Sequence, residues 1–287
     1  MQMDEGTIMI IANSSLDDEV NVGHPVVRRI EISDLRDVLA KGFDDFAAMP
    51  THSAFVIVIY PIVGLILLRL SFGYDMLPVV FPLLAGFALL GPFTAIGLYE
   101  MSRRRELGLP ASLEMFNVFS LLRIWPIAIM GVVLAVIFIA WLIAAMTIYE
   151  STFGNWYPAT TSAFVQRVFS TPAGWILIVV GCGVGFGFAL LTFTISVVSF
   201  PMLVDRDVSA GVAVTTSIRA VAANPIAMAA WALIVVAGLL LGSLPVLVGL
   251  AVVLPVLGHS TWHLYRKLVQ HEYTAPAQPR PQVNPGD

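Results

Sequence analysis

The chain has 287 residues, of which 58% are hydrophobic and only 12% are charged, and its mean hydropathy is +0.86. A soluble domain carries about 25% charged residues, so half that fraction excludes an ordinary soluble fold and indicates lipid as the main solvent. The net charge of −4 argues against a nucleic-acid-binding surface, and the single cysteine, Cys182, excludes an intrachain disulfide.

The N-terminal region combines a tail with one amphipathic segment. Residues 1–30 are acidic and have no apolar period, so we expect a flexible cytoplasmic tail there. Ser33 then provides an N-cap for a helix with charged residues on its other faces. Its apolar residues recur at helical spacing on Leu35, Leu39, Phe43 and Phe46. Such a helix suits the membrane interface, or equally packs on the membrane bundle of its own chain.

Six apolar runs follow, and a helix needs about 20 residues to cross the hydrocarbon layer. Four of them cover residues 53–68, 76–99, 124–149 and 172–200, and two more lie between residues 225 and 265, divided near Gly242–Pro245. Surface helices beginning at Ser112 and Val208 precede the third and fifth runs. We therefore predict an all-α polytopic membrane protein with six transmembrane helices arranged as three hairpins, each preceded by an amphipathic interfacial helix.

The predicted membrane domain spans residues 31–269, and the Pro-, Gln- and Asn-rich residues 270–287 form a disordered cytoplasmic tail. Basic residues accumulate on the cytoplasmic side of membrane proteins. With both termini inside, all 15 lysines and arginines except Arg69 and Arg167 fall on that side. The sequence thus predicts cytoplasmic N- and C-termini.

The second and third hairpins begin alike, with Trp125-Pro126-Ile127-Ala128 matching Asn224-Pro225-Ile226-Ala227. Three similar hairpins would form a parallel internal repeat. The similarity is weak, so coincidence of membrane-adapted sequences is an equal explanation.

Polar residues concentrate at the predicted cytoplasmic ends of the spans, where they form a candidate collar. The collar consists of His52, Tyr99, Glu100, Arg103, Asp205, Arg206, Asp207, His259, His263 and Arg266. His259 and His263 lie on one helix face and are weak candidates for a metal or haem site, since nothing in the sequence forces a third ligand near them. Hydrogen bonding to backbone or headgroups is the simpler role, so we expect no cofactor, no metal and no catalytic residue.

The glycine-rich run in the fourth predicted span favours close helix packing over phosphate binding. Gly181, Gly183, Gly185 and Gly187 contain two GxxxG pairs, and their flanks are apolar.

Several short motifs resemble those of a known bacterial membrane family. They are Pro50-Thr51-His52, Tyr60-Pro61, Phe81-Pro82, Leu90-Gly91-Pro92-Phe93, Gly97-Leu98-Tyr99-Glu100, Ser102-Arg103-Arg104-Arg105-Glu106, Ser199-Phe200-Pro201, Asp205-Arg206-Asp207, Asn224-Pro225 and Gly258-His259 with Trp262-His263-Leu264-Tyr265-Arg266. From about Ile30 to Val269 the chain resembles the integral-membrane domain of unknown function twenty-one eighty-nine. The resemblance implies the bacterial inner membrane, and it brings no established activity or catalytic residues. Some members carry a label relating them to cytochrome c oxidase subunit I, but the five histidines here are too few for its haems and copper.

The sequence therefore predicts a non-enzymatic inner-membrane accessory, assembly or scaffold protein, with another membrane protein or a second copy as partner. One alternative is a permease or lipid-handling channel for a small or apolar substrate. The charge-free span centres argue against an ion-coupled carrier but leave one for apolar or lipid-like substrates open. The other is a haem or metal binder through His259 and His263.

Overall fold

The computed structural model describes residues 25–49, 69, 80, 82–84, 86, 89, 91–109, 121–156, 158, 160–244 and 248–270. The secondary structure of these residues is helical, apart from one isolated antiparallel bridge between Val27 and Val269. The helices are α2 (Asp34–Ala48), α5 (Gly91–Thr94), α6 (Ile96–Glu106), α7 (Leu121–Phe153), α8 (Thr161–Ser170), α9 (Pro172–Ser196), α10 (Ser199–Asp205), α11 (Ala210–Ala223), α12 (Pro225–Ser243) and α13 (Leu250–Leu268).

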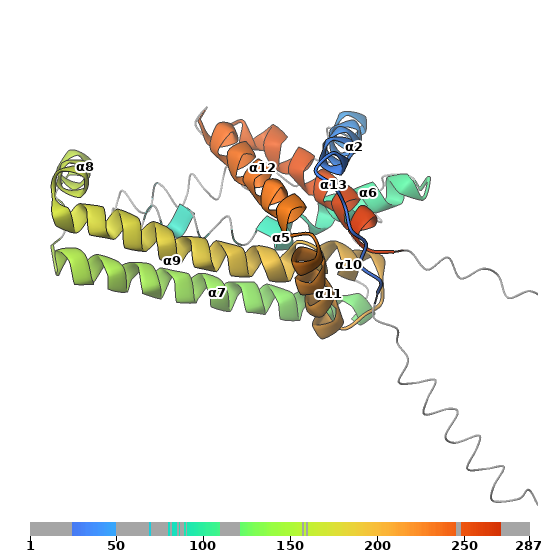
Figure 1. Cartoon of the computed structure of the whole chain (residues 1–287), viewed down its shortest axis with the longest axis horizontal. Helices are drawn as coiled ribbons and strands as arrows, with labels where there is room; N and C mark the ends of the chain where they lie inside the picture. The colour runs from blue at the N-terminus through green and yellow to red at the C-terminus, as the bar shows by residue number, and fades with distance from the viewer. Residues whose placement is uncertain are drawn as a thin grey trace, which may run out of the picture.

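Helices α7 and α9 run side by side along the length of the molecule, and α8 joins them at one end (Figure 1). Helix α9 begins sharply because Pro172 occupies its first turn and the Thr171 hydroxyl accepts a hydrogen bond from Gly174 N at 3.1 Å. Trp141 of α7 packs against Phe188 of α9, with ring centroids 5.8 Å apart.

Three stretches of the described chain are long and apolar enough to cross a membrane, namely Ile124–Phe153, Pro172–Asp205 and Pro225–Ser243. They confirm the third, fourth and fifth predicted runs as possible spans. The first run and most of the second lie outside the described residues. Residues 150–171, which separate the third and fourth predicted runs, contain helix α8, whose N-cap Thr160 accepts a hydrogen bond from Ala163 N at 3.2 Å.

Helix α13 returns along α12 and changes character halfway. Its first half is apolar and approaches α12 closely, since a Cβ added to Gly242 would lie 2.9 Å from Leu250 Cδ2. Its second half, from His259 onward, carries polar and aromatic side chains and packs against α2 and α6. The sixth predicted run is therefore a helix, although α13 is not among the three candidate spans.

Helix α2 lies on α13, and the face that it buries is shifted from the predicted apolar stripe. Leu35 of that stripe is buried and Leu39 and Phe46 are half-buried, whereas Phe43 is 56% exposed. Val38, Gly42 and Asp45 are buried as well. The stripe prediction was wrong at Phe43, because a close backbone approach at Gly42 and a polar contact at Asp45 turn the docked face of α2 away from it.

The segment before α2 is tied to the end of α13. Arg28 N donates to Leu268 O at 2.7 Å, and Gln270 N donates to Val26 O at 2.9 Å. Buried Asn224 also holds this segment, accepting from Ile30 N at 2.8 Å and donating to Arg28 O at 3.0 Å. Residues 25–30, expected to belong to the flexible tail, are thus part of the folded domain.

Candidate functional site

The polar side chains gather at the end of α7 and α9 opposite α8, where α2, α6, α10, α11 and the second half of α13 meet (Figure 1). We call this region the polar end. It contains two neighbouring groups of contacts. The inner cluster consists of Asp45, Ser102, Arg105, His259 and His263.

Asp45 is the centre of the inner cluster, and its side chain is only 5% exposed. Its Oδ1 accepts a hydrogen bond from Arg105, and its Oδ2 accepts from Ser102 Oγ at 2.5 Å. His263 Nε2 lies 2.8 Å from the same Oδ2. One carboxylate of α2 is therefore bound by donors from α6 and from α13.

The hydrogen bonds of the inner cluster indicate where its protons lie. Burial alone would raise the pKa of Asp45, but hydrogen bonds from His263, Ser102 and Arg105 outweigh burial and lower that pKa below its ordinary value. Because an ionised carboxylate only accepts, Ser102 donates its single hydroxyl proton to Asp45. The contact of 2.8 Å between Ser102 Oγ and His259 Nδ1 then requires a proton on Nδ1. Ser102 thus links His259 to Asp45.

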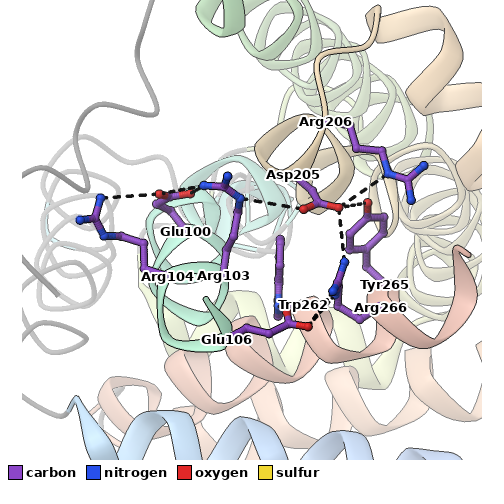
Figure 2. A network of polar contacts seen from close by, with 9 residues as sticks. All are labelled: Glu100, Arg103, Arg104, Glu106, Asp205, Arg206, Trp262, Tyr265 and Arg266. Atoms are coloured by element: carbon purple, nitrogen blue, oxygen red, sulfur yellow. Dashed lines mark hydrogen bonds and ion pairs between the residues drawn. The ribbon is translucent and has the colours of Figure 1, made fainter. Parts of the chain in front are cut away.

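The second group, which we call the outer network, is drawn in Figure 2. It consists of Glu100, Arg103, Arg104, Glu106, Asp205, Arg206, Trp262, Tyr265 and Arg266. Its carboxylates come from α6 and α10. They face side chains of α6 and α13, and Asp205 also faces Arg206, the residue directly after α10.

Asp205, at the end of α10, is the most connected acid of the outer network. The Tyr265 hydroxyl donates to its Oδ2 at 2.7 Å. The guanidinium groups of Arg206 and Arg266 lie 3.7 Å from the same oxygen, and Arg103 lies 3.9 Å from Oδ1. This single carboxylate therefore joins α10 to α6 and α13 (Figure 2).

Glu106 connects α6 with α13 in a similar way. Arg266 donates to Glu106 Oε1 from Nε at 3.0 Å and from Nη2 at 2.7 Å, while Trp262 Nε1 donates to Oε2 at 3.1 Å. Glu100 remains within α6, where it pairs with Arg103 at 3.1 Å and Arg104 at 4.0 Å.

Most of the predicted collar residues do come together. Their positions in the described chain are as follows: His259 and His263 in the inner cluster, and Glu100, Arg103, Asp205, Arg206 and Arg266 in the outer network. Tyr99 is buried in the main hydrophobic core. Asp207 is exposed, and His52 lies outside the described residues.

Three of the five residues of the inner cluster are not among the predicted site residues. Asp45 is one of the charged residues outside the predicted apolar stripe, and Ser102 and Arg105 occur only in the motif Ser102-Arg103-Arg104-Arg105-Glu106 that carries the family resemblance. One clue was available in the spacing of Gly42 and Asp45, which are one turn apart and therefore share a helix face. Nothing in the sequence indicates that this face meets α13.

The imidazoles make polar contacts with protein groups. Within the described parts of the chain, no group of three or more His, Cys, Asp or Glu residues is arranged to hold a metal ion. His263 is instead engaged by Asp45, and His259 by Ser102.

The glycines of α9 have different surroundings. A Cβ added to Gly185 would lie 2.9 Å from Trp141, so this glycine allows α7 to approach. Positions Gly181, Gly183 and Gly187 have no such neighbour within 4 Å among the described residues. For these three, close packing against another helix stays a prediction.

Long helices with apolar residues exposed along their length, such as Val132 and Ile139 of α7 and Phe186 of α9, define an integral membrane protein of the α-helical class. Residues 80–205 match the model of a family described as predicted integral membrane protein (DUF2189). The expected resemblance is confirmed over these residues, while Asn224-Pro225 and Gly258-His259 lie beyond the match. No curated protein and no solved structure matches the chain.

Proposed function

We propose that this protein is a non-enzymatic accessory, assembly or scaffold component of a membrane, and that its polar end is a docking platform for another membrane protein. The observation that carries the proposal is the mutual pairing of charges at the polar end. Carboxylates at positions 45, 100, 106 and 205 bind arginines of this chain and connect α2, α6, α10 and α13. Charged groups that bind one another in this way suit a rigid surface. In a reaction centre, by contrast, charged groups face a substrate.

The spans support the same proposal. The apolar parts of α7, α9 and α12 contain no Asp, Glu, Lys, Arg or His over residues 124–149, 172–196 and 225–243. Ion-coupled carriers place ionisable groups within the membrane, so these helices are better suited to anchoring a platform than to coupled transport.

We place the platform on the cytoplasmic face of a bacterial inner membrane. The chain would cross that membrane as three hairpins of six helices, with both termini inside. The basic residues support this orientation, because Arg103, Arg104, Arg105, Arg206 and Arg266 all lie at the polar end.

The proposal is tested by photocrosslinking and co-purification of the full-length protein from its native membrane in mild detergent. A photoreactive amino acid at Phe43, which is 56% exposed on the outer side of α2, should crosslink to one reproducible membrane protein. The matched control is Val165, which is 47% exposed on α8 at the other end of the molecule (Figure 1). Recovery of the protein alone, or the same products from both positions, would refute the docking platform.

A further inference from the structure

The inner cluster resembles a filled binding site more than an ordinary surface ion pair. Three donors from two other helices converge on the Asp45 carboxylate, namely Arg105 and Ser102 of α6 and His263 of α13. Arg105 takes one carboxylate oxygen, while Ser102 and His263 share the other. This arrangement is specific for a carboxylate, because both oxygens are bound by directional donors.

Without the Asp45 carboxylate, the donors of the inner cluster would carry the positive charge of Arg105. The nearby acids of α6 have other partners, since Glu106 binds Arg266 and Trp262, and Glu100 binds Arg103. Among the described residues, the ion-pair partner of Arg105 is therefore Asp45, and the acids of α6 are engaged elsewhere.

An unused donor lies on the same seam. The hydroxyl of Ser260 is completely buried and has no hydrogen-bond partner among the residues that the structure describes. It faces Gly42, which lies one turn before Asp45 on the same side of α2. A buried hydroxyl without a partner costs about 1–3 kcal/mol, so this contact weakens the docking of α2 beside Asp45.

Helix α2 is held by apolar contacts in its first half and by ion pairs at its exposed edge. Leu35, Val38 and the partly buried Leu39 pack on the main hydrophobic core, and Met49 is buried directly after the helix. Lys267 binds Asp34 at 2.8 Å and Asp37 at 3.0 Å, and such partly exposed pairs contribute about 0–1 kcal/mol each. The stretch around Asp45 therefore has no large buried apolar side chain of its own within α2.

We propose that Ser102, Arg105 and His263 form a binding site for a small carboxylate anion, which Asp45 of α2 occupies in this structure. The stretch of α2 around Asp45 is then a displaceable cover, and a carboxylate from solution competes with Asp45 for the same donors. This inference goes beyond the docking function and does not depend on it.

Chemical rescue tests the site in the full-length protein in lipid nanodiscs. Asp45→Gly removes the internal carboxylate and leaves the donors in place. Sodium formate, compared with sodium chloride at equal ionic strength, should then raise the thermal midpoint saturably. A shift of roughly 3 °C is expected when formate is in about tenfold excess over its dissociation constant.

Two variants control this measurement. Asp44→Gly makes the same substitution at the neighbouring exposed position and should give no formate-specific shift. Asp45→Asn fills the site with an uncharged group of the same shape and should also be insensitive. An Asp45→Gly response no larger than that of Asp44→Gly would overturn the proposal.

A second measurement uses the unmodified protein and so does not depend on the folding of a variant. Formate should accelerate hydrogen–deuterium exchange of the α2 amides relative to chloride, while exchange in α7 and α9 stays constant. The measurement is made at the formate concentration that saturates the rescue of Asp45→Gly or, without saturation, at the highest attainable concentration. Unchanged exchange in α2 would show that α2 is a fixed element, and it would equally overturn the proposal.

Discussion

Ser102 shows how much one hydroxyl contributes at the polar end. It donates to Asp45 and lies 2.8 Å from His259, so it joins α2 and α13 to its own helix, α6. Ser102→Ala would leave two buried groups each short of one partner. We expect a loss of about 1–3 kcal/mol in the free energy of unfolding, measured by titration with a denaturing detergent.

The control for this change is Ser151→Ala. The Ser151 hydroxyl donates only to Thr147 of its own helix and is exposed, so the loss should be within about 0.5 kcal/mol. Equal effects of the two substitutions would contradict the bridging role of Ser102.

The lowered pKa of Asp45 predicts a specific response to acid. A carboxylate whose pKa is lower in the folded state contributes stability that is fully present above its ordinary value of 3.8. That stability is lost as the pH falls through the lowered folded value. Hydrogen exchange of α2 should therefore increase below about pH 4 in the wild-type protein, whereas Asp45→Asn should lack this component. The prediction fails if both proteins show the same acid response.

At the scale of elements, Gly42 determines how closely α2 approaches α13. A Cβ at this position would overlap the Ser260 hydroxyl and lie 2.6 Å and 2.8 Å from Ser260 N and Cα. Backbone atoms cannot rotate away, so Gly42→Ala must push α2 outward. Overpacking of this kind costs about 1–3 kcal/mol, which a thermal melt and α2 hydrogen exchange would measure.

Gly187→Ala is the matched control, because that helical glycine has open space beside it among the described residues. Alanine is favoured over glycine in helices by about 1 kcal/mol, so this variant should be neutral or slightly more stable. If Gly42→Ala behaved in the same way, α2 would not be docked as the structure shows.

Asn224 attaches the N-terminal segment to the bundle. It accepts from Ile30 N and donates to the carbonyls of Arg28 and Ala220. Asn224→Asp keeps the acceptor but replaces the donor with a charged oxygen that faces those two carbonyls. Trypsin should then cut after Arg28 or Arg29 several-fold faster, whereas Asn155→Asp at an exposed turn should leave this rate unchanged. Equal cleavage rates would show that Asn224 does not hold the segment.

The elements differ in how far sequence could predict them. Helix α11 follows from Ser209, whose hydroxyl caps it, and from Asn224-Pro225, which ends it. The docked face of α2 follows only in part from periodicity, because Leu35 of the stripe is buried whereas Phe43, which is equally apolar, is exposed. Tertiary contacts at Gly42 and Asp45 override the local pattern, and one sequence does not show which element this face meets.

At the scale of the whole molecule, hydropathy predicted the spans better than the site. Runs without charge must be helical to satisfy their backbone in lipid, so α7, α9 and α12 could be predicted from composition alone. The polar end brings together Asp45, Ser102 and His259, which are 57 and 157 residues apart along the chain. Their meeting depends on how the helices pack against one another, which the sequence alone does not predict.

The unequal distribution of basic residues between the polar end and the α8 end predicts the orientation of the molecule in the membrane. Five of the arginines that pair at the polar end would lie in the cytoplasm, while α8 at the other end carries only Arg167 as a basic residue. In a Cys182→Ser background, Ser162→Cys on α8 should react with a membrane-impermeant maleimide in intact cells. Asp44→Cys on α2 should react only after the membrane is permeabilised, because the positive ends of membrane proteins are retained inside. Labelling of Asp44→Cys in intact cells, with protection of Ser162→Cys, would reverse the orientation and place the docking platform outside.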